Sequence, residues 1–143
     1  MTSTYGVMFY GFVLPFFDMD MDALNADWEA FTFPHRKPCI DASKKFSAAE
    51  RDQFNSDLTQ YQAWRSSNRC IEINWCGDVE SGENARSYFL HCPSLSKWID
   101  DSVVLPLDFE PVNSGVNENL IEFCDRFNLP KRKPRWHLGV KVY

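Results

Sequence analysis

Residues 70–92 have the sequence CIEINWCGDVESGENARSYFLHC, and this stretch decides the fold class. Apolar and polar side chains alternate over its first six residues, so Ile71, Ile73 and Trp75 share one face of a strand. Turn-forming residues occupy 77–84, and residues 87–92 are again rich in aromatic and branched side chains. The stretch therefore predicts a β-hairpin and an antiparallel sheet.

On the N-terminal side of the hairpin, residues 5–14 are aromatic and branched, which favours a strand. Apolar residues then recur at helical spacing over residues 21–31, after a candidate cap at Asp18 or Asp20. Ser47 and Glu50 form a capping box, which predicts that a second helix begins directly after Ser47.

On the C-terminal side, residues 103–109 favour a further strand with an edge or bend at Pro106. A short helix is expected around residues 120–127, capped by Asn117 or Asn119 and ended by Asn128. Residues 136–143 alternate as a last strand. We expect its inward residues to be Trp136, Leu138, Val140 and Val142, and its outward residues to be His137, Lys141 and Tyr143.

The expected order of elements is β-α-α-β-β-β-α-β. It indicates an α+β fold, in one domain over residues 1–143, with a mainly antiparallel sheet of about five strands. Two to three helices are expected to pack on one face of this sheet. The length of 143 residues and the 44% of hydrophobic residues suffice for a core without disulfides or metal, and exclude a disordered or coiled-coil chain.

The sequence also allows expectations about the cellular compartment and the oligomeric state. No apolar run approaches the ~20 residues of a membrane span, and we expect no membrane partner. The first basic residue is Arg36, which does not fit a signal peptide. Five cysteines without tight spacing favour free thiols in a reducing cytoplasm. Either a monomer or a homodimer is compatible with the sequence.

Charge is segregated along the chain, whose formal net charge is −5. Residues 70–125 contain eleven acids and two bases, whereas residues 126–143 contain six bases and no acid. Such segregation can produce a bipolar surface that orients a partner. The alternative is that the segments interleave in space and neutralise one another.

The acidic segments suggest the first functional hypothesis, a non-catalytic binding protein that engages its partner through a charged surface. An acidic surface of this kind could engage a basic nucleic-acid groove of the partner. The residues expected to form it are Asp78, Glu80, Glu83, Asp100, Asp101, Asp108 and Glu110.

The basic run of residues 131–135 suggests the alternative, a domain or enzyme that binds a nucleotide-like small molecule. Lys131, Arg132, Lys133 and Arg135 would hold phosphate groups, and Trp136 would stack on a base. Direct nucleic-acid binding is less favoured, because the whole chain has a pI of about 5.1. A further alternative is a structural or assembly protein whose terminal strands form a homodimer edge.

Candidate metal and catalytic motifs are incomplete. Residues 18–29 place acids as in a calcium loop, but Ala23 stands where the sharp turn needs glycine. Pairing residues 70–76 with 86–92 would bring Cys92 near Cys70, without the spacing of a zinc site. His91 and Cys92 are expected on opposite faces of a strand, whereas His35 and Cys39 share a loop and could meet. We therefore expect no cofactor, lean against an enzyme and assign no catalytic residue.

Two terminal motifs carry a resemblance to a known group of proteins. These are the strand Tyr5-Gly-Val-x-Phe-Tyr-Gly11 and the closing Pro134-x-Trp136-x-Leu138. Together they resemble small uncharacterised proteins encoded by phages and prophages. The resemblance implies an accessory phage protein that acts in the host cytoplasm. With the charged surface, it implies an inhibitor that blocks a host nucleic-acid-handling or defence complex. It implies no functional residue.

Overall fold

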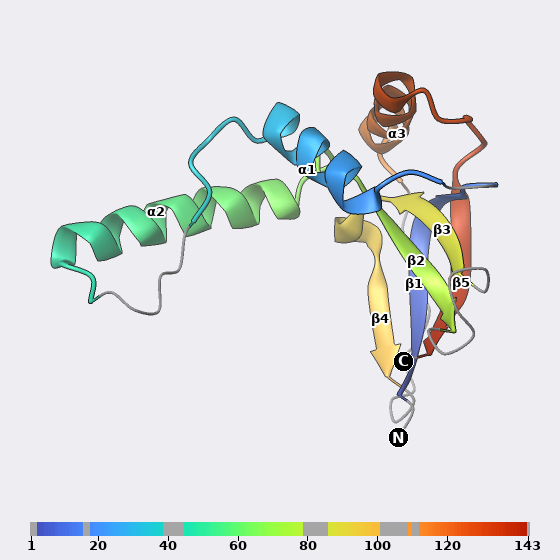
Figure 1. The fold of residues 1–143 in the computed structure, drawn as a ribbon, viewed down its shortest axis with the longest axis horizontal. Helices are drawn as coiled ribbons and strands as arrows, with labels where there is room; N and C mark the ends of the chain where they lie inside the picture. The colour runs from blue at the N-terminus through green and yellow to red at the C-terminus, as the bar shows by residue number, and fades with distance from the viewer. Residues whose placement is uncertain are drawn as a thin grey trace.

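The computed structural model describes residues 3–15, 18–38, 45–78, 86–100, 109 and 112–142. The elements follow in the order β1 (Thr4–Val13), α1 (Met21–Thr32), α2 (Ala48–Arg65), β2 (Glu72–Asp78), β3 (Arg86–His91), the 3-10 helix η2 (Pro93–Leu95), β4 (Lys97–Asp100), α3 (Ser114–Phe127) and β5 (Arg135–Val142). The α+β class and the order of helices and strands are therefore confirmed (Figure 1).

The described strands form one mixed sheet in the order β3-β2-β5-β1-β4. Most pairings are antiparallel, but β2 and β5 run parallel where Gly77 lies opposite Lys141. An additional pairing between β1 and β3 closes the sheet on itself. The first strand of the chain thus contacts β3, β4 and β5, and the sheet has an inner and an outer face.

Closure depends on Gly11, where β1 meets β3. A Cβ atom placed on Gly11 would lie 1.8 Å from the carbonyl oxygen of Leu90. No side chain fits this space, so only glycine lets the two backbones approach so closely.

The main core lies between the outer face of the sheet and helices α1 and α3. Tyr10, Ile73, Leu90, Trp28 and Phe123 belong to this buried cluster. A smaller cluster of Val7, Phe9 and Phe89, with Cys76 packed against it, fills the inside of the closed sheet. Gly139 also faces inward, because its Cβ position is 3.2 Å from the Cys76 sulfur.

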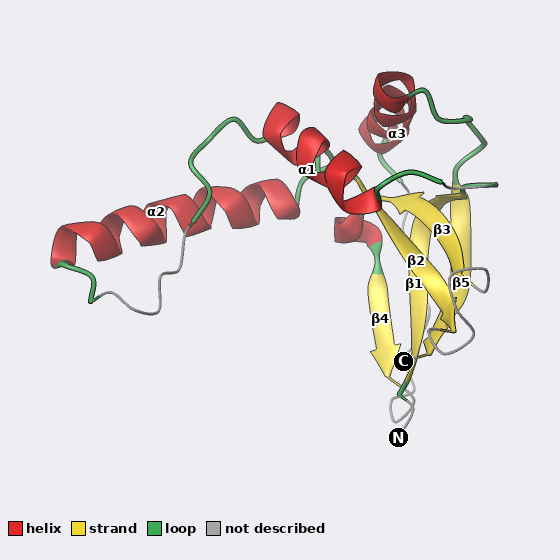
Figure 2. Cartoon of the chain, in the orientation of Figure 1, coloured by secondary structure: helices red, strands yellow, loops and turns green. Residues whose placement is uncertain are grey.

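Helix α2 differs from the other two helices in its position. It projects away from the sheet, whereas α1 and α3 lie against one end of it (Figures 1 and 2). Its C-terminal part is anchored through Trp64 and Tyr61, which pack with Phe33 and Cys70, and Asp57 in its middle pairs with Arg36 at 3.5 Å. None of the helices in the described part of the chain is long and apolar enough to cross a membrane.

The local signals for helix ends are mostly confirmed. Asp20 caps α1, and the Ser47 side chain accepts a hydrogen bond from the Glu50 amide at the start of α2. Asn128 adopts a left-handed conformation just past α3. The prediction that Asn117 or Asn119 caps this helix is wrong. Helix α3 begins about one turn earlier, and Asn113 is its N-cap.

The predicted hairpin forms, but its register is shifted by one residue. Ile73 pairs with Leu90 rather than with Phe89. The observed register places Ile73 and Leu90 together in the core under the helices, and leaves Phe89 for the inside of the sheet. A one-residue slip would exchange these two faces.

The inward and outward faces expected for residues 137–141 of the last strand are wrong. Leu138 and Val140 are 66% and 51% exposed, whereas Lys141 is only 6% exposed. The reason is that the side of β5 that faces the inside of the closed sheet carries His137, Gly139 and Lys141.

The strand expected over residues 103–109 lies outside the described residues, apart from Phe109. The structure also has a strand that the sequence analysis did not predict, β4 at Lys97–Asp100, which pairs with the first half of β1. This strand lacks a clear sequence signal because its pattern, KWID, is short.

Candidate anion-binding site

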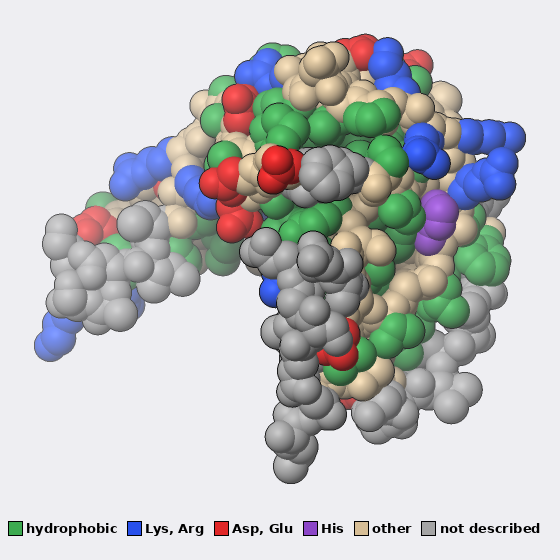
Figure 3. Space-filling view, turned by 45° about the vertical axis from the view of Figure 1, so that its right-hand side comes forward, with side chains coloured by type: hydrophobic (Ala, Val, Ile, Leu, Met, Phe, Trp, Pro, Cys, Tyr) green, Lys and Arg blue, Asp and Glu red, His purple; other side chains and the backbone are tan. Residues whose placement is uncertain are grey.

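Three exposed cationic side chains converge at the start of β5. Arg132, Lys133 and Arg135 line a hollow of about 390 Å³ together with His137, Phe12 and Val13. Figure 3 shows Lys and Arg side chains gathered beside a histidine on the right-hand side of the molecule. The hollow therefore combines positive charge with an apolar wall supplied by β1.

Two anchors hold the basic segment at the surface. Leu129, buried next to the end of α3, donates its amide to the Cys124 carbonyl. Downstream, Arg135 pairs with Gly11 of β1 at the start of β5. Pro134 biases Lys133 towards an extended backbone. Residues 131–133 thus span two fixed points and leave their side chains in solvent.

The positive charge of the hollow depends on which of its neighbouring cations already form ion pairs with acidic side chains. Lys131 forms an ion pair with Asp125 at 2.5 Å. Arg132, Lys133 and Arg135 form no ion pair with a described residue. Their charge is therefore available to an anion in the hollow.

His137 was not assigned to this site by the sequence. Its ring stacks on Phe9 with centroids 4.9 Å apart. Its Nε2 atom is buried and has no hydrogen-bond partner among the described residues. The only sequence signal was its two-residue spacing from Arg135, which puts both side chains on the same face of the strand.

Trp136 is separated from the hollow for the same reason. It points to the opposite face of β5, where its ring meets Tyr10 and Phe109 at centroid distances of 5.5 Å. The structure thus brings together three of the five residues of the predicted phosphate site. Lys131 is engaged with Asp125, and Trp136 packs away from the hollow.

Of the residues expected to form an acidic surface, the structure describes Asp78 and Asp100. Asp78 lies opposite Val142, and Asp100 lies opposite Tyr5, which in turn pairs with Lys141. Both therefore lie at the end of the sheet where β5 stops, roughly 23 Å along the strand from Arg135 at ~3.3 Å per residue. The other residues of this set lie outside the described part: Glu80, Glu83, Asp101, Asp108 and Glu110.

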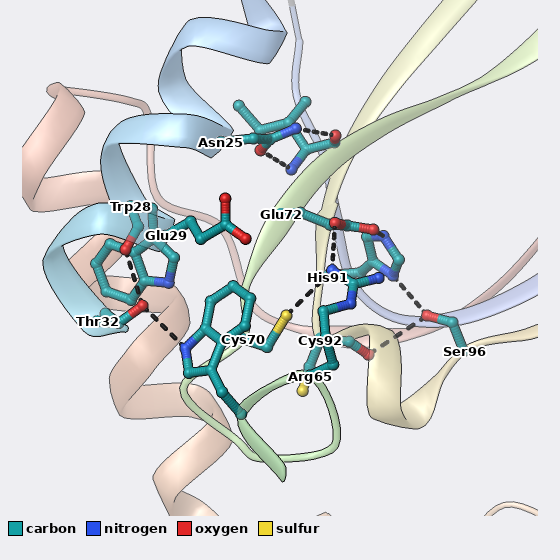
Figure 4. A network of polar contacts seen from close by, with 12 residues as sticks. Asn25, Trp28, Glu29, Thr32, Arg65, Cys70, Glu72, His91, Cys92 and Ser96 are labelled. Atoms are coloured by element: carbon teal, nitrogen blue, oxygen red, sulfur yellow. Dashed lines mark hydrogen bonds and ion pairs between the residues drawn. The ribbon is translucent and has the colours of Figure 1, made fainter. Parts of the chain in front are cut away.

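A second polar cluster, between α2 and the sheet, was missed by the sequence analysis (Figure 4). Arg65 donates to Glu72 at 2.9 Å, and Glu72 lies 3.6 Å from Nε2 of His91. The Nδ1 atom of His91 is 2.5 Å from the Ser96 hydroxyl. This chain of contacts links α2, β2, β3 and the segment that enters β4.

The protonation state of Glu72 reflects these neighbours. Burial, the largest single influence, would raise the pKa of its carboxyl group. The hydrogen bond and charge of Arg65, together with the nearby His91 ring, outweigh burial and hold this pKa below the usual 4.5. The ionised carboxylate is therefore the form that holds Arg65 and His91 in place.

A hollow of about 220 Å³ beside this cluster is lined by Glu29, Lys37, Tyr61, Arg65 and Glu72, among others. Lys37 pairs with Glu29 at 3.0 Å, as Arg65 does with Glu72. Burial, with the adjacent Glu29 carboxylate, raises the pKa of the Tyr61 hydroxyl to about 12. These charges satisfy one another, so the cluster ties helices to the sheet and leaves little charge for a ligand.

The cysteines in the described part of the chain lack the features of catalytic nucleophiles. Burial raises the pKa of Cys70 to about 12 and that of Cys124 to about 11, and it also raises the pKa values of Cys76 and Cys92. At neutral pH these thiols are protonated. His91 contacts the rings inside the sheet while Cys92 lies in the outer core, which confirms that they face opposite ways.

The remaining candidates from the sequence can be placed as follows. Cys39 lies outside the described residues, so its approach to His35 is not seen. Within the described ranges, no three His, Cys, Asp or Glu side chains are grouped to hold a metal ion. Asp20, part of the calcium-like stretch, serves as the cap of α1.

The chain matches no protein-family model, no curated protein and no solved structure.

Proposed function

We propose that this chain is a binding protein that holds a phosphate-bearing ligand in the hollow at the start of β5. The observation that supports this most directly is the convergence of Arg132, Lys133 and Arg135, which have no described acidic partner, on one hollow with His137. Guanidinium and ammonium groups form short, charge-assisted hydrogen bonds with phosphate oxygens.

The size and lining of the hollow support a nucleotide or the end of a nucleic-acid strand. A volume of about 390 Å³ falls in the range of small-molecule sites, ~300–1,000 Å³. Val13, which is 40% exposed, and Phe12 supply an apolar wall beside the cations. Such a wall suits the non-phosphate part of the ligand.

Direct binding measurements test this proposal and separate the two sources of phosphate. Fluorescence anisotropy measures the binding of labelled single-stranded DNA and RNA, and calorimetry measures the binding of nucleoside mono-, di- and triphosphates. We expect saturable binding either of the nucleic acids or of the nucleotides. Binding should weaken with salt, because each phosphate contact releases counterions. Inorganic phosphate should compete in either case.

Matched variants locate the site. Arg132→Ala and Arg135→Ala should each weaken binding about five- to tenfold, as expected for the loss of one charge-assisted contact. Lys131→Ala is the control, because Lys131 is paired with Asp125 and does not line the hollow. Equal losses in all three variants, or no binding in either series, would contradict the proposal.

A second candidate function rests on Asp78 and Asp100, which lie at the same end of the sheet on β2 and β4, with β5 and β1 between them. In this reading the chain blocks a host nucleic-acid-handling or defence complex by engaging a basic groove. The test is an affinity pulldown from bacterial lysate at low and high salt. A stoichiometric protein partner that elutes at high salt, and that the Asp78→Ala variant binds less well, would support this function. A partner whose binding changes neither with salt nor with Asp78→Ala would reject it.

A further inference from the structure

Three of the six basic residues between positions 126 and 143 are engaged elsewhere in the fold. Arg126 pairs with Asp27 of α1 at 2.7 Å. Lys131 pairs with Asp125 near the end of α3. Lys141 is 6% exposed, on the inward side of β5. The other three are the cations that line the hollow: Arg132, Lys133 and Arg135. The accessible positive charge described in this segment therefore converges on one place and does not continue along α3.

The lining of the hollow lacks a surface on which a base would stack. Proteins that hold single-stranded nucleic acid along its length spread cations over successive phosphates and stack the bases on aromatic rings. Among the described residues that line the hollow, Phe12 is the only Phe, Tyr or Trp, and it is 3% exposed. One face of the His137 ring is covered by Phe9, and Trp136 packs on the opposite side of β5. Binding should therefore depend on the phosphate group more than on the base.

The charge of a phosphate group depends on how many ester bonds it forms. A monoester, at the end of a nucleotide or of a strand, carries about −1.5 to −2 charges at pH 7 and has three acceptor oxygens. A diester within a nucleic-acid backbone carries about one negative charge, because a second ester bond takes up one of those oxygens.

Three converging cations without a described acidic partner match a doubly charged group better than a singly charged one. The forked guanidinium groups of Arg132 and Arg135 can each bind two phosphate oxygens, and Lys133 adds a point charge. We infer that the hollow selects a terminal phosphate monoester over the phosphodiester of a nucleic-acid backbone, with little discrimination between bases. This inference rests on the proposed function, because it names which phosphate group the same hollow binds.

A matched pair of nucleotides tests the selection. Calorimetry at fixed salt compares uridine 5′-monophosphate with the methyl ester of its phosphate, which has the same base and sugar but less charge. The monophosphate should bind at least about tenfold more tightly, because the methyl ester loses a charge-assisted contact. Adenosine 5′-monophosphate should bind with an affinity similar to that of the uridine nucleotide, because the described lining has no exposed aromatic platform for the base.

A pair of oligonucleotides distinguishes the two sources of a terminal phosphate. Fluorescence anisotropy compares a single strand that carries a 5′-phosphate with the same strand ending in a 5′-hydroxyl group, each labelled at its other end. Tighter binding of the phosphorylated strand, by about tenfold or more, identifies the end of a nucleic acid as a ligand. A preference confined to the nucleotide pair identifies the free nucleotide as the ligand.

Variants test whether the cations of the hollow produce the preference. Arg132→Ala should remove most of the preference for the monophosphate over its methyl ester, because one of the charges that meet the doubly charged group is lost. Lys131→Ala is the control and should keep the full preference, because Lys131 is paired with Asp125 and does not line the hollow. Circular dichroism establishes that both variants are folded.

The outcomes separate this inference from the proposed function. Equal affinity for the monophosphate and its methyl ester, in a chain whose binding Arg132→Ala still weakens, would overturn the inference and leave the proposed function standing. A preference that survives Arg132→Ala unchanged would also overturn the inference. If none of these ligands binds, both the inference and the proposed function are wrong.

Discussion

The ammonium nitrogen of Lys141 lies 3.7 Å from the centre of the Trp75 ring. The ring of Trp98 is 5.3 Å from the same nitrogen, and Arg86 approaches Trp75 at 4.6 Å. Lys141 therefore connects β5 to β2 and β4 at the end where the parallel pairing is made. A cation over an indole face is attracted by the ring quadrupole, and more strongly when it is removed from water.

Lys141→Met should lower the free energy of unfolding by about 1–2 kcal/mol, because the stem is kept and the cation–π attraction is lost. Chemical denaturation followed by tryptophan fluorescence measures this. Lys97→Met on β4 is the control: Lys97 is exposed, so its replacement should change stability by less than about 0.5 kcal/mol. Equal effects of the two variants would contradict the assigned role of Lys141.

Gly11→Ala should destabilise the chain by more than about 3 kcal/mol, because the new methyl group would push apart the backbones of β1 and β3. Gly6→Ala on the same strand is the control, since its nearest atoms are 3.7 Å away and it has room for a Cβ. Thermal unfolding of both variants is the measurement. Similar melting temperatures for the Gly11→Ala and Gly6→Ala variants would show that the fold does not require the close approach of β1 and β3 at Gly11.

Stability should fall at acidic pH through Glu72. Its pKa in the folded chain is below the usual 4.5, so its contribution is fully present above that pH. The contribution is lost as the pH falls through the folded-state pKa, because the unfolded chain then binds the proton more readily. Glu72→Gln should be less stable than the wild type by about 1–3 kcal/mol at pH 7.

The difference between wild type and Glu72→Gln should shrink as the pH is lowered below 4.5. Urea titrations at a series of pH values measure both chains under identical conditions. Glu50→Gln is the control, because Glu50 is exposed in the first turn of α2. A constant difference between wild type and Glu72→Gln across the pH range would show that Glu72 acts through packing alone.

Cysteine labelling should report the burial of the thiols. In a Cys39→Ser variant, the four remaining cysteines are the ones that the structure describes. With pKa values of about 12 and about 11, Cys70 and Cys124 should react with a disulfide reagent at pH 8 at least about a hundredfold more slowly than a model thiol. All four should react rapidly in denaturant; rapid reaction of Cys70 and Cys124 in the native protein would contradict their placement.

Local signals in the chain predicted local structure well. Ser47 starts α2, Asp20 starts α1 and Asn128 ends α3, because each interaction involves neighbours a few residues away. The order of helices and strands follows from hydrophobic periodicity in the same way. The basic residues of the hollow were also visible, because they form one short run.

Other features required distant parts of the chain to meet. The register of the hairpin depends on tertiary packing. Leu90 packs in the core under the helices, whereas Phe89 packs inside the closed sheet. Trp136 could not be separated from the phosphate site without knowing that the hollow lies on the Arg135 and His137 side of β5. Of the predicted acidic surface, the structure adds only that Asp78 and Asp100 lie at the same end of the sheet.

Strand β5 shows where local pattern stops and tertiary structure takes over. The alternation of residues 136–142 determined that Leu138 and Val140 share one face and that Lys141 lies on the other. It did not determine which face is covered. Tertiary structure decided this, because the close approach of β1 and β3 at Gly11 closed the sheet. Closure made the Lys141 side of β5 an interior and left the Leu138 side exposed.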